Sequence, residues 1–97
     1  MTPAVFHPAA DAEFLDAIAF YEARADGLGR AYLLEAEHTL TLIRQFPQIG
    51  PVIEADIRRF AFSRFRFSYI YRLPGDHVRI LAVMHHRQRP GYWQDRR

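Results

Sequence analysis

Residues 56–85 read DIRRFAFSRFRFSYIYRLPGDHVRILAVMH, and this stretch decides the fold. Apolar and polar side chains alternate along it with a period of two, which is typical of β-strands that bury one face. We predict three strands here, over residues 56–62, 65–72 and 77–85. The connections between them are Ser63-Arg64 and the turn Leu73-Pro74-Gly75-Asp76, in which Pro presets φ and Gly accepts a positive φ.

The side chains of these strands sort onto two faces once the strands are paired. We pair Phe62 with Phe65 and Arg72 with His77, and directly opposed residues then share a face. A slip of one residue would scatter the aromatic rings, so the pattern specifies the register. One face carries Phe60, Phe62, Phe65, Phe67, Tyr69, Tyr71, Val78, Ile80, Ala82 and Met84. The other, which we name the arginine face, carries Arg59, Arg66, Arg72, His77, Arg79 and His85, with Ile70, Leu81 and Val83 among them.

A short strand and two helices are expected before these three strands. Val5 and Phe6 lie in an extended segment, and Pro8 begins a helix because its fixed φ suits the first helical position. Gly27 ends that helix, and a second helix runs over about residues 30–46. Apolar residues recur at helical spacing at Phe14, Ile18, Tyr21 and Ala25 in the first helix, and at Leu33, Ala36, Leu40 and Ile43 in the second.

The order of these elements predicts an α+β fold. Two helices joined by a few residues pack as an antiparallel hairpin, and this hairpin should cover the aromatic face of the sheet. We therefore expect a short N-terminal strand and a helical hairpin on one face of a mainly antiparallel sheet of three to four strands. Residues 1–97 should form a single domain, with 86–97 as a basic and aromatic C-terminal segment.

The charge of the chain is divided unevenly between its two parts. All 13 cationic residues are arginine, and the formal net charge is +2. Residues 1–57 hold three arginines against nine acids, which gives −6, whereas residues 58–97 hold ten arginines against two acids, which gives +8. The absence of lysine reflects a bias in composition, but the crowding of arginine into the last 40 residues suggests an anionic partner.

Several classes of protein are excluded by what the sequence lacks. With no cysteine, the chain has no disulfide scaffold, no thiolate zinc site and no cysteine nucleophile. His85 and His86 are neighbours in an extended segment, so they point to opposite faces and do not chelate one metal. No apolar run approaches the roughly 18–20 residues that span a bilayer. We expect no metal, no cofactor, no membrane contact and no signal peptide, and hence a cytoplasmic protein.

The ordered set of motifs resembles the ParE branch of the RelE/ParE superfamily, the small toxins of bacterial type II toxin–antitoxin modules. The most specific part is the ending, a strand followed by His-x-Arg-x-Arg-Pro-x-Tyr-Trp. Two departures from the family pattern are visible: His7 replaces the usual Thr or Ser cap, which should weaken the first helical turn, and Arg66 replaces a common Pro. The resemblance is carried by residues 6–11 and 14, by Phe46-Pro47, and by residues 57–60, 65–72 and 80–93.

The resemblance implies a toxin that a cognate antitoxin neutralises. Toxins of the ParE kind poison DNA gyrase, and those of the RelE kind cut messenger RNA on the ribosome, so one fold serves two targets. The implied antitoxin is a small protein with an acidic segment. The assembly remains open between a homodimer and a heterotetramer with the antitoxin.

Two surfaces are candidate binding sites. Large apolar residues amid exposed cations indicate a contact that a partner buries, although a solvated outer face of the sheet is the alternative. In the tail, basic and aromatic residues suit a polyanionic target, but the aromatic pair could instead plug the core. For the antitoxin we select Arg59, Arg66, Arg72, Arg79, Leu81 and Val83, and for the target Arg87, Arg89, Tyr92 and Trp93.

Two other functions compete with the gyrase interpretation. In a ribosome-dependent endoribonuclease His85 would be the general acid or base, because its pKa lies near neutrality. Glu54 would then be a base, Arg59 or Arg79 would hold the phosphate, and Tyr92 would stack on a nucleobase. The absence of lysine counts against the ribonuclease interpretation. The third possible function is that of a weakly toxic co-repressor that acts together with the antitoxin.

Overall fold

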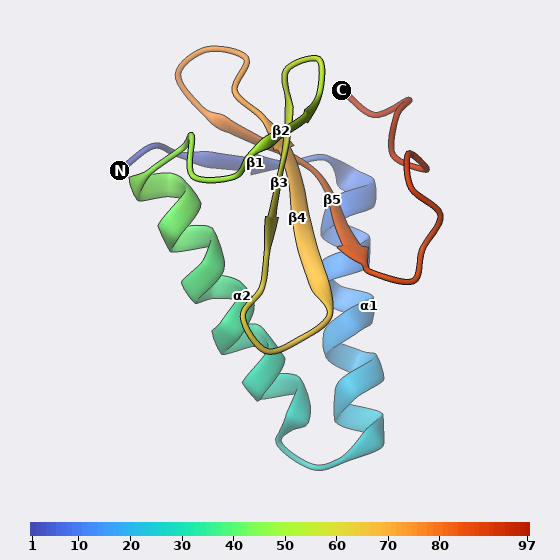
Figure 1. Cartoon of the computed structure of the whole chain (residues 1–97). Helices are drawn as coiled ribbons and strands as arrows, with labels where there is room; N and C mark the ends of the chain where they lie inside the picture. The colour runs from blue at the N-terminus through green and yellow to red at the C-terminus, as the bar shows by residue number, and fades with distance from the viewer.

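The computed structural model describes residues 1–97 and contains two helices and five strands (Figure 1). The α+β class predicted from the sequence is confirmed. The elements in chain order are β1 (Ala4–Phe6), α1 (Pro8–Arg24), α2 (Leu28–Gln45), β2 (Val52–Glu54), β3 (Ile57–Ala61), β4 (Phe67–Arg72) and β5 (Val78–His85). No helix combines the length and the apolar character that crossing a membrane requires.

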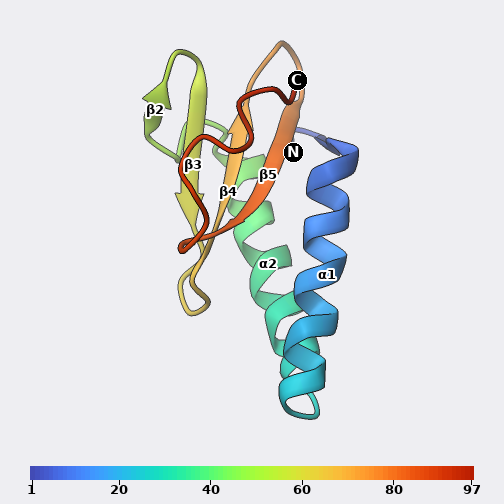
Figure 2. The same cartoon turned by 90° about the vertical axis from the view of Figure 1, so that its right-hand side faces the viewer.

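One sheet contains all five strands in the order β1-β5-β4-β3-β2. The pair β1 and β5 is parallel, and the other three pairs are antiparallel. The α1–α2 hairpin lies along one face of this sheet, and residues 86–97 cross the opposite face (Figure 2). Strand β2 was not predicted, because its three exposed residues give too short a pattern to stand out.

The first helix is capped by the residue that departs from the family pattern. The backbone N–H of Ala9 donates a hydrogen bond to Nδ1 of His7 at 3.0 Å, so the imidazole does what a Ser or Thr hydroxyl does in other helices. The expected weakening of the first turn is therefore wrong. The backbone N–H of His7 also donates to the carbonyl of Ile80 at 2.8 Å, which joins the start of α1 to β5.

The strand registers differ from the predicted ones by two or three residues. Phe60 opposes Tyr69 instead of Phe67, and this shift of two preserves the faces. Tyr71 opposes Ile80, again a shift of two, but an irregularity follows between Ile70 and Tyr71. Beyond it Phe67 opposes His85 instead of Ala82, a shift of three. Because side chains alternate, the odd shift exchanges the faces of residues 82–85.

This exchange produces two cores instead of one. The larger core lies between the helical hairpin and the sheet, and the smaller one lies on the far face, so that face is not the open arginine surface that we expected. The larger core contains Ala10, Ala17, Tyr32, Ala36, Ile43, Phe62, Phe67, Tyr69, Tyr71, Val78, Ile80 and Val83. The smaller core contains Ile57, Ile70, Leu81, Ala82, Met84 and Trp93.

A buried carboxylate joins α2 to the β3–β4 connection. Glu35 accepts hydrogen bonds from the backbone N–H and the hydroxyl of Ser63, and Arg64 lies 3.8 Å from its carboxylate. Burial raises the pKa of Glu35, but the Ser63 hydrogen bonds and the Arg64 charge outweigh it and hold this pKa below its ordinary value. The bonds to Glu35 stabilise a connection longer than the two residues expected, which accounts for the shift in the β3–β4 register.

Candidate functional site

The C-terminal segment, residues 86–97, is held on the sheet by its two aromatic residues. Trp93 is 4% exposed and belongs to the smaller core, against which the half-buried Tyr92 also packs. Burial of an indole ring of this size contributes about 2–3 kcal/mol. Tyr92 and Trp93 therefore close the smaller core, which was the alternative to target binding considered for this pair. Arg87 and Arg89 remain exposed.

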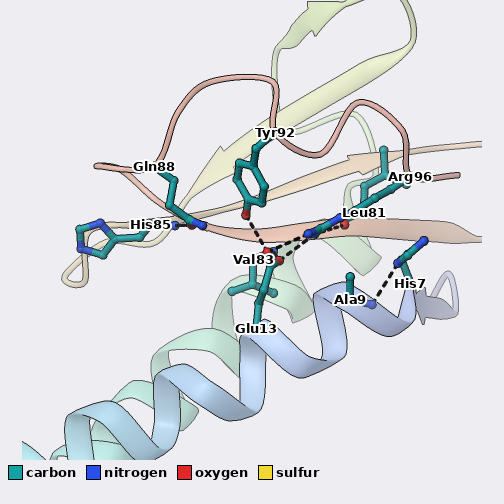
Figure 3. Close-up of polar contacts among 9 residues, drawn as sticks. All are labelled: His7, Ala9, Glu13, Leu81, Val83, His85, Gln88, Tyr92 and Arg96. Atoms are coloured by element: carbon teal, nitrogen blue, oxygen red, sulfur yellow. Dashed lines mark hydrogen bonds and ion pairs between the residues drawn. The ribbon is translucent and has the colours of Figure 1, made fainter.

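A single carboxylate on α1 fastens this segment, as Figure 3 shows. Oε1 of Glu13 accepts hydrogen bonds from the backbone N–H of Val83 at 3.0 Å and from Nη1 of Arg96 at 3.0 Å. Oε2 accepts from the Tyr92 hydroxyl at 2.9 Å and from Nη2 of Arg96 at 3.1 Å. Burial and the adjacent Glu13 charge raise the pKa of Tyr92, so this phenol stays protonated and donates. We name this arrangement the Glu13 latch.

The latch also protects an unpaired strand edge. Strand β1 covers β5 only as far as Ile80, and the rest of that edge has no neighbouring strand. Side chains take the place of the missing strand: Arg96 donates to the carbonyl of Leu81 at 3.0 Å, and the Gln88 side chain accepts from the N–H of His85 at 2.8 Å (Figure 3). Side chains thus occupy the carbonyl of Leu81 and the N–H groups of Val83 and His85, which leaves this edge fewer free backbone groups for pairing with another chain.

A groove runs between α1 and the end of the sheet. Two adjoining hollows of about 350 and 470 Å³ share Phe20, Tyr21 and His85 among their lining residues. We name them together the α1–β5 groove. Phe20 is 52% exposed there, and such an exposed aromatic ring beside a concave surface is typical of a protein contact. The basic end is lined by Arg24, Arg66 and Arg87, and the acidic end by Glu13 and Asp16.

The sequence of residues 4–90 matches the profile of the family described as "ParE toxin of type II toxin-antitoxin system, parDE". The chain belongs to the ParE toxin family. A solved structure, "Chromosomal ParDE TA system from P. aeruginosa", is similar with a TM-score of 0.71 and 20% sequence identity, covering 88% of this chain and 96% of that one. At this identity the likeness shows the fold alone. None of the curated protein sequences matches.

The structure separates the residues of this ParE toxin that we selected for antitoxin binding. Leu81 and Val83 are at most 1% exposed, so they offer no surface to a partner. Arg72 pairs with Asp56 at 3.2 Å, and Nε of Arg79 donates to the carbonyl of Arg97 at 3.0 Å. Of the four arginines selected, Arg59 is half-buried, and only Arg66 is exposed and lies in the α1–β5 groove.

The residues considered for ribonuclease chemistry are also engaged in separate contacts. His85 lies on the helix side of the sheet, where its ring meets that of Phe67 at 5.0 Å, and not on the arginine face. Glu54 accepts hydrogen bonds from the Gln94 amide at 3.0 and 3.1 Å, and Tyr92 belongs to the latch. The five candidate residues therefore do not converge on one position where a scissile phosphate could sit.

The α1–β5 groove could not be predicted from the assumed strand register. That register assigned His85 to the face of the sheet opposite the helices. In the structure His85 lies on the helix side, where it lines the groove together with Tyr21. The sequence did hold one signal: Phe20 and Arg24 are four residues apart, one helical turn, just before the turn between the helices. In the structure Arg24 lies over the Phe20 ring at 4.5 Å. No signal in the sequence indicated that Glu13 would meet residues 83, 92 and 96.

Proposed function

We propose that this ParE toxin poisons DNA gyrase in the cytoplasm and that a cognate antitoxin neutralises it by filling the α1–β5 groove. The observation that carries the proposal is the position of Arg87. It lines the basic end of the groove and also belongs to the exposed part of the C-terminal segment. One residue therefore joins the surface suited to an antitoxin to the surface suited to a target.

The groove supports an antitoxin segment of defined chemistry. Its basic end is lined by Arg24, Arg66, Arg87 and His85 and by no acidic residue, so an acidic segment complements it. The exposed Phe20 ring offers an apolar contact of the kind that often dominates a binding energy. The free negative charge at the other end is that of Asp16, since Glu13 is paired with Arg96, and it gives the bound segment a preferred direction, with its acidic residues beside the arginines.

The C-terminal segment supports the contact with the target. Arg87 and Arg89 project from a segment that Trp93 and the Glu13 latch hold in place. Because the backbone that carries them is held, these two arginines lose less freedom on binding a phosphate or a carboxylate than arginines on a loose tail would. Membership in the ParE toxin family supports gyrase as the proposed target. An antitoxin bound over Arg87 would then block the target surface directly.

Four charge or size changes test this arrangement together. Arg87→Glu is expected to weaken antitoxin binding and gyrase inhibition, each by about tenfold or more. Phe20→Ala should weaken only antitoxin binding, and Arg89→Glu only gyrase inhibition. Arg30→Glu is the matched control, since Arg30 is exposed on α2 outside the groove and should change neither. The measurements are the Kd for the protein encoded beside the toxin gene and the concentration that halves supercoiling.

Two results would contradict the proposal. If Arg87→Glu leaves antitoxin affinity as unchanged as Arg30→Glu does, the antitoxin does not occupy the groove. If gyrase inhibition survives both Arg87→Glu and Arg89→Glu in folded protein, the C-terminal segment does not contact the target.

A further inference from the structure

Strand β5 ends in a tight turn, residues 85–88, which His85 closes with three hydrogen bonds. The backbone N–H of His85 donates to Oε1 of Gln88 at 2.8 Å (Figure 3). Its carbonyl accepts from the backbone N–H of Gln88 at 3.0 Å. Its ring nitrogen Nδ1 accepts from the backbone N–H of Arg87, also at 3.0 Å. One residue thus holds the backbone of the turn that carries Arg87.

The same turn holds a second arginine of the α1–β5 groove. The backbone N–H of His86 donates to the carbonyl of Arg66 at 2.9 Å, which ties the turn to the β3–β4 connection. Arg66 and Arg87 both line the basic end of the groove, and His85 lines it beside them. The backbone of two of the three arginines at this end therefore depends on the turn.

The contact with Arg87 also fixes where the ring of His85 carries its proton. A backbone N–H can only donate, so Nδ1 must offer a lone pair. A neutral imidazole has one N–H, which then lies on Nε2. While this bond is made His85 is neutral, and the positive charge at this end of the groove comes from Arg24, Arg66 and Arg87.

His7 makes the same contact elsewhere in the chain. Its Nδ1 accepts from the backbone N–H of Ala9, again two residues later and again at 3.0 Å (Figure 3). There the ring caps helix α1, so the contact organises the backbone that follows it. Asn and Asp side chains do the same in Asx turns, where they bond to the backbone two residues on. The Nδ1 atom of His85 is therefore a turn-forming acceptor.

The ring of His85 has one further contact, which by itself would make the residue a packing residue only. It meets the ring of Phe67 edge to face, with 5.0 Å between the ring centres. A phenylalanine could make this contact as well, but it could not accept a hydrogen bond. The two roles of the ring can therefore be separated by substitution.

We propose that His85 is a positioning residue of the α1–β5 groove, which acts by holding the backbone of Arg87 through Nδ1. The proposal rests on the proposed function, since it deepens the account of how the groove binds an acidic antitoxin segment. With the turn closed, the backbone of Arg87 is fixed and joined to that of Arg66. Both arginines then lose less freedom when the acidic segment binds than they would on an open turn.

The position of the ring proton is the first test, and it needs no partner. Nitrogen spectra of the ¹⁵N-labelled full chain would be recorded at pH 8.5, well above the ordinary histidine pKa of about 6.5. Nδ1 of His85 should give the signal of an unprotonated ring nitrogen and Nε2 that of a protonated one. His85→Phe identifies the signals by removing them. A proton on Nδ1 of His85 would overturn the proposal.

Antitoxin affinity is the second test. His85→Asn and His85→Leu have nearly the same shape, but only Asn keeps an acceptor, whereas His85→Phe keeps a ring without one. The Leu and Phe variants should bind the antitoxin about fivefold more weakly than the parent, and Asn about fivefold more tightly than Leu. His38→Phe is the control, because His38 is exposed on α2 outside the groove and should leave the affinity unchanged.

The variant Arg87→Glu separates failure of this proposal from failure of the proposed function. If Arg87→Glu weakens binding but Asn and Leu at position 85 bind equally, the antitoxin fills the groove and His85 does not position it. A His85→Phe protein that binds as tightly as the parent would overturn the proposal too, because ring packing would then be sufficient. If Arg87→Glu leaves the affinity unchanged, the proposed function fails, and the role of His85 in binding fails with it.

Discussion

The carboxylate of Glu13 and the guanidinium of Arg96, 83 positions apart in the chain, form a two-point ion pair with N–O distances of 3.0 and 3.1 Å. Both side chains are largely buried, with exposed fractions of 20% and 18%. A parallel pair of charge-assisted bonds fixes orientation as well as distance. The first helix thus determines where the last residues of the chain lie, and with them the exposed arginines of the C-terminal segment.

Glu13→Gln tests this role of the latch. The amide keeps the shape of the side chain but removes the charge that Arg96 faces, so we expect the free energy of unfolding to fall by about 1–3 kcal/mol. The emission of the single tryptophan should shift to the red as the segment loosens. Urea unfolding followed by fluorescence measures both effects.

Asp16→Asn is the matched control for that change, because Asp16 is exposed on the same helix and makes no hydrogen bond to the segment. Equal stability and equal emission in Glu13→Gln and Asp16→Asn would show that the latch does not hold the segment.

Trp93 and Arg89 should separate an anchoring role from a binding role. Trp93→Ala removes the largest side chain of the smaller core and is expected to cost about 3 kcal/mol or more. Arg89→Ala should change the stability by less than about 0.5 kcal/mol and still reduce gyrase inhibition. Circular dichroism during denaturation and a supercoiling assay give the two readouts, and an Arg89→Ala protein with full inhibition would remove Arg89 from the target surface.

Replacement of tyrosine by phenylalanine should have different effects on stability at two buried positions of the larger core. The Tyr32 hydroxyl is buried with no partner, so Tyr32→Phe should leave the free energy of unfolding unchanged or raise it by about 1 kcal/mol. The Tyr69 hydroxyl donates to the carbonyl of Ala36 at 2.9 Å, so Tyr69→Phe should lower it by about 1 kcal/mol. Urea unfolding of the two variants in parallel tests the pair. A loss in Tyr32→Phe as large as that in Tyr69→Phe would mean that the Tyr32 hydroxyl has an acceptor.

Glu35 gives the protein a dependence of stability on pH. Because the folded-state pKa lies below its ordinary value of 4.5, the ionised carboxylate stabilises the fold above that pH, and this contribution is lost as the pH falls through the lower folded-state value. Glu35→Gln should therefore be less stable than the parent at pH 7, by about 1–3 kcal/mol, and the gap should narrow below pH 4.5.

Glu37→Gln serves as the comparison, since Glu37 is exposed on the same helix and its carboxylate makes no hydrogen bond. It should differ little from the parent at either pH. A gap between Glu35→Gln and the parent that stays constant from pH 7 to acid would contradict the assigned role of the Ser63 contact.

Much of the fold follows from local sequence patterns. Strand β4 alternates strictly, with Phe67, Tyr69 and Tyr71 toward the helices and Ile70 toward the other face, so its orientation could be predicted. In strand β5, residues 80–84 are all apolar and all buried, and such a run carries no alternation from which to assign faces. A continuous apolar run does indicate a strand covered on both sides, which is the signal that would have excluded an open arginine face.

The candidate site was less predictable because it depends on long-range contacts. The tail was recognised as basic and aromatic, and the alternative that Trp93 closes the core is what the structure shows. The pairing of Glu13 with Arg96 depends on how helix α1 crosses the sheet, which no local pattern encodes. The groove lined by Phe20 and Arg66 likewise appears only when the end of α1 and the β3–β4 connection meet.

The supercoiling activity of purified DNA gyrase, measured with increasing amounts of the toxin, tests the central claim most directly. The account predicts that supercoiling falls and cleaved DNA accumulates, and that adding the antitoxin encoded beside the toxin gene restores activity. Undiminished supercoiling at a large excess of folded toxin, together with cleavage of messenger RNA in a translation extract, would contradict it.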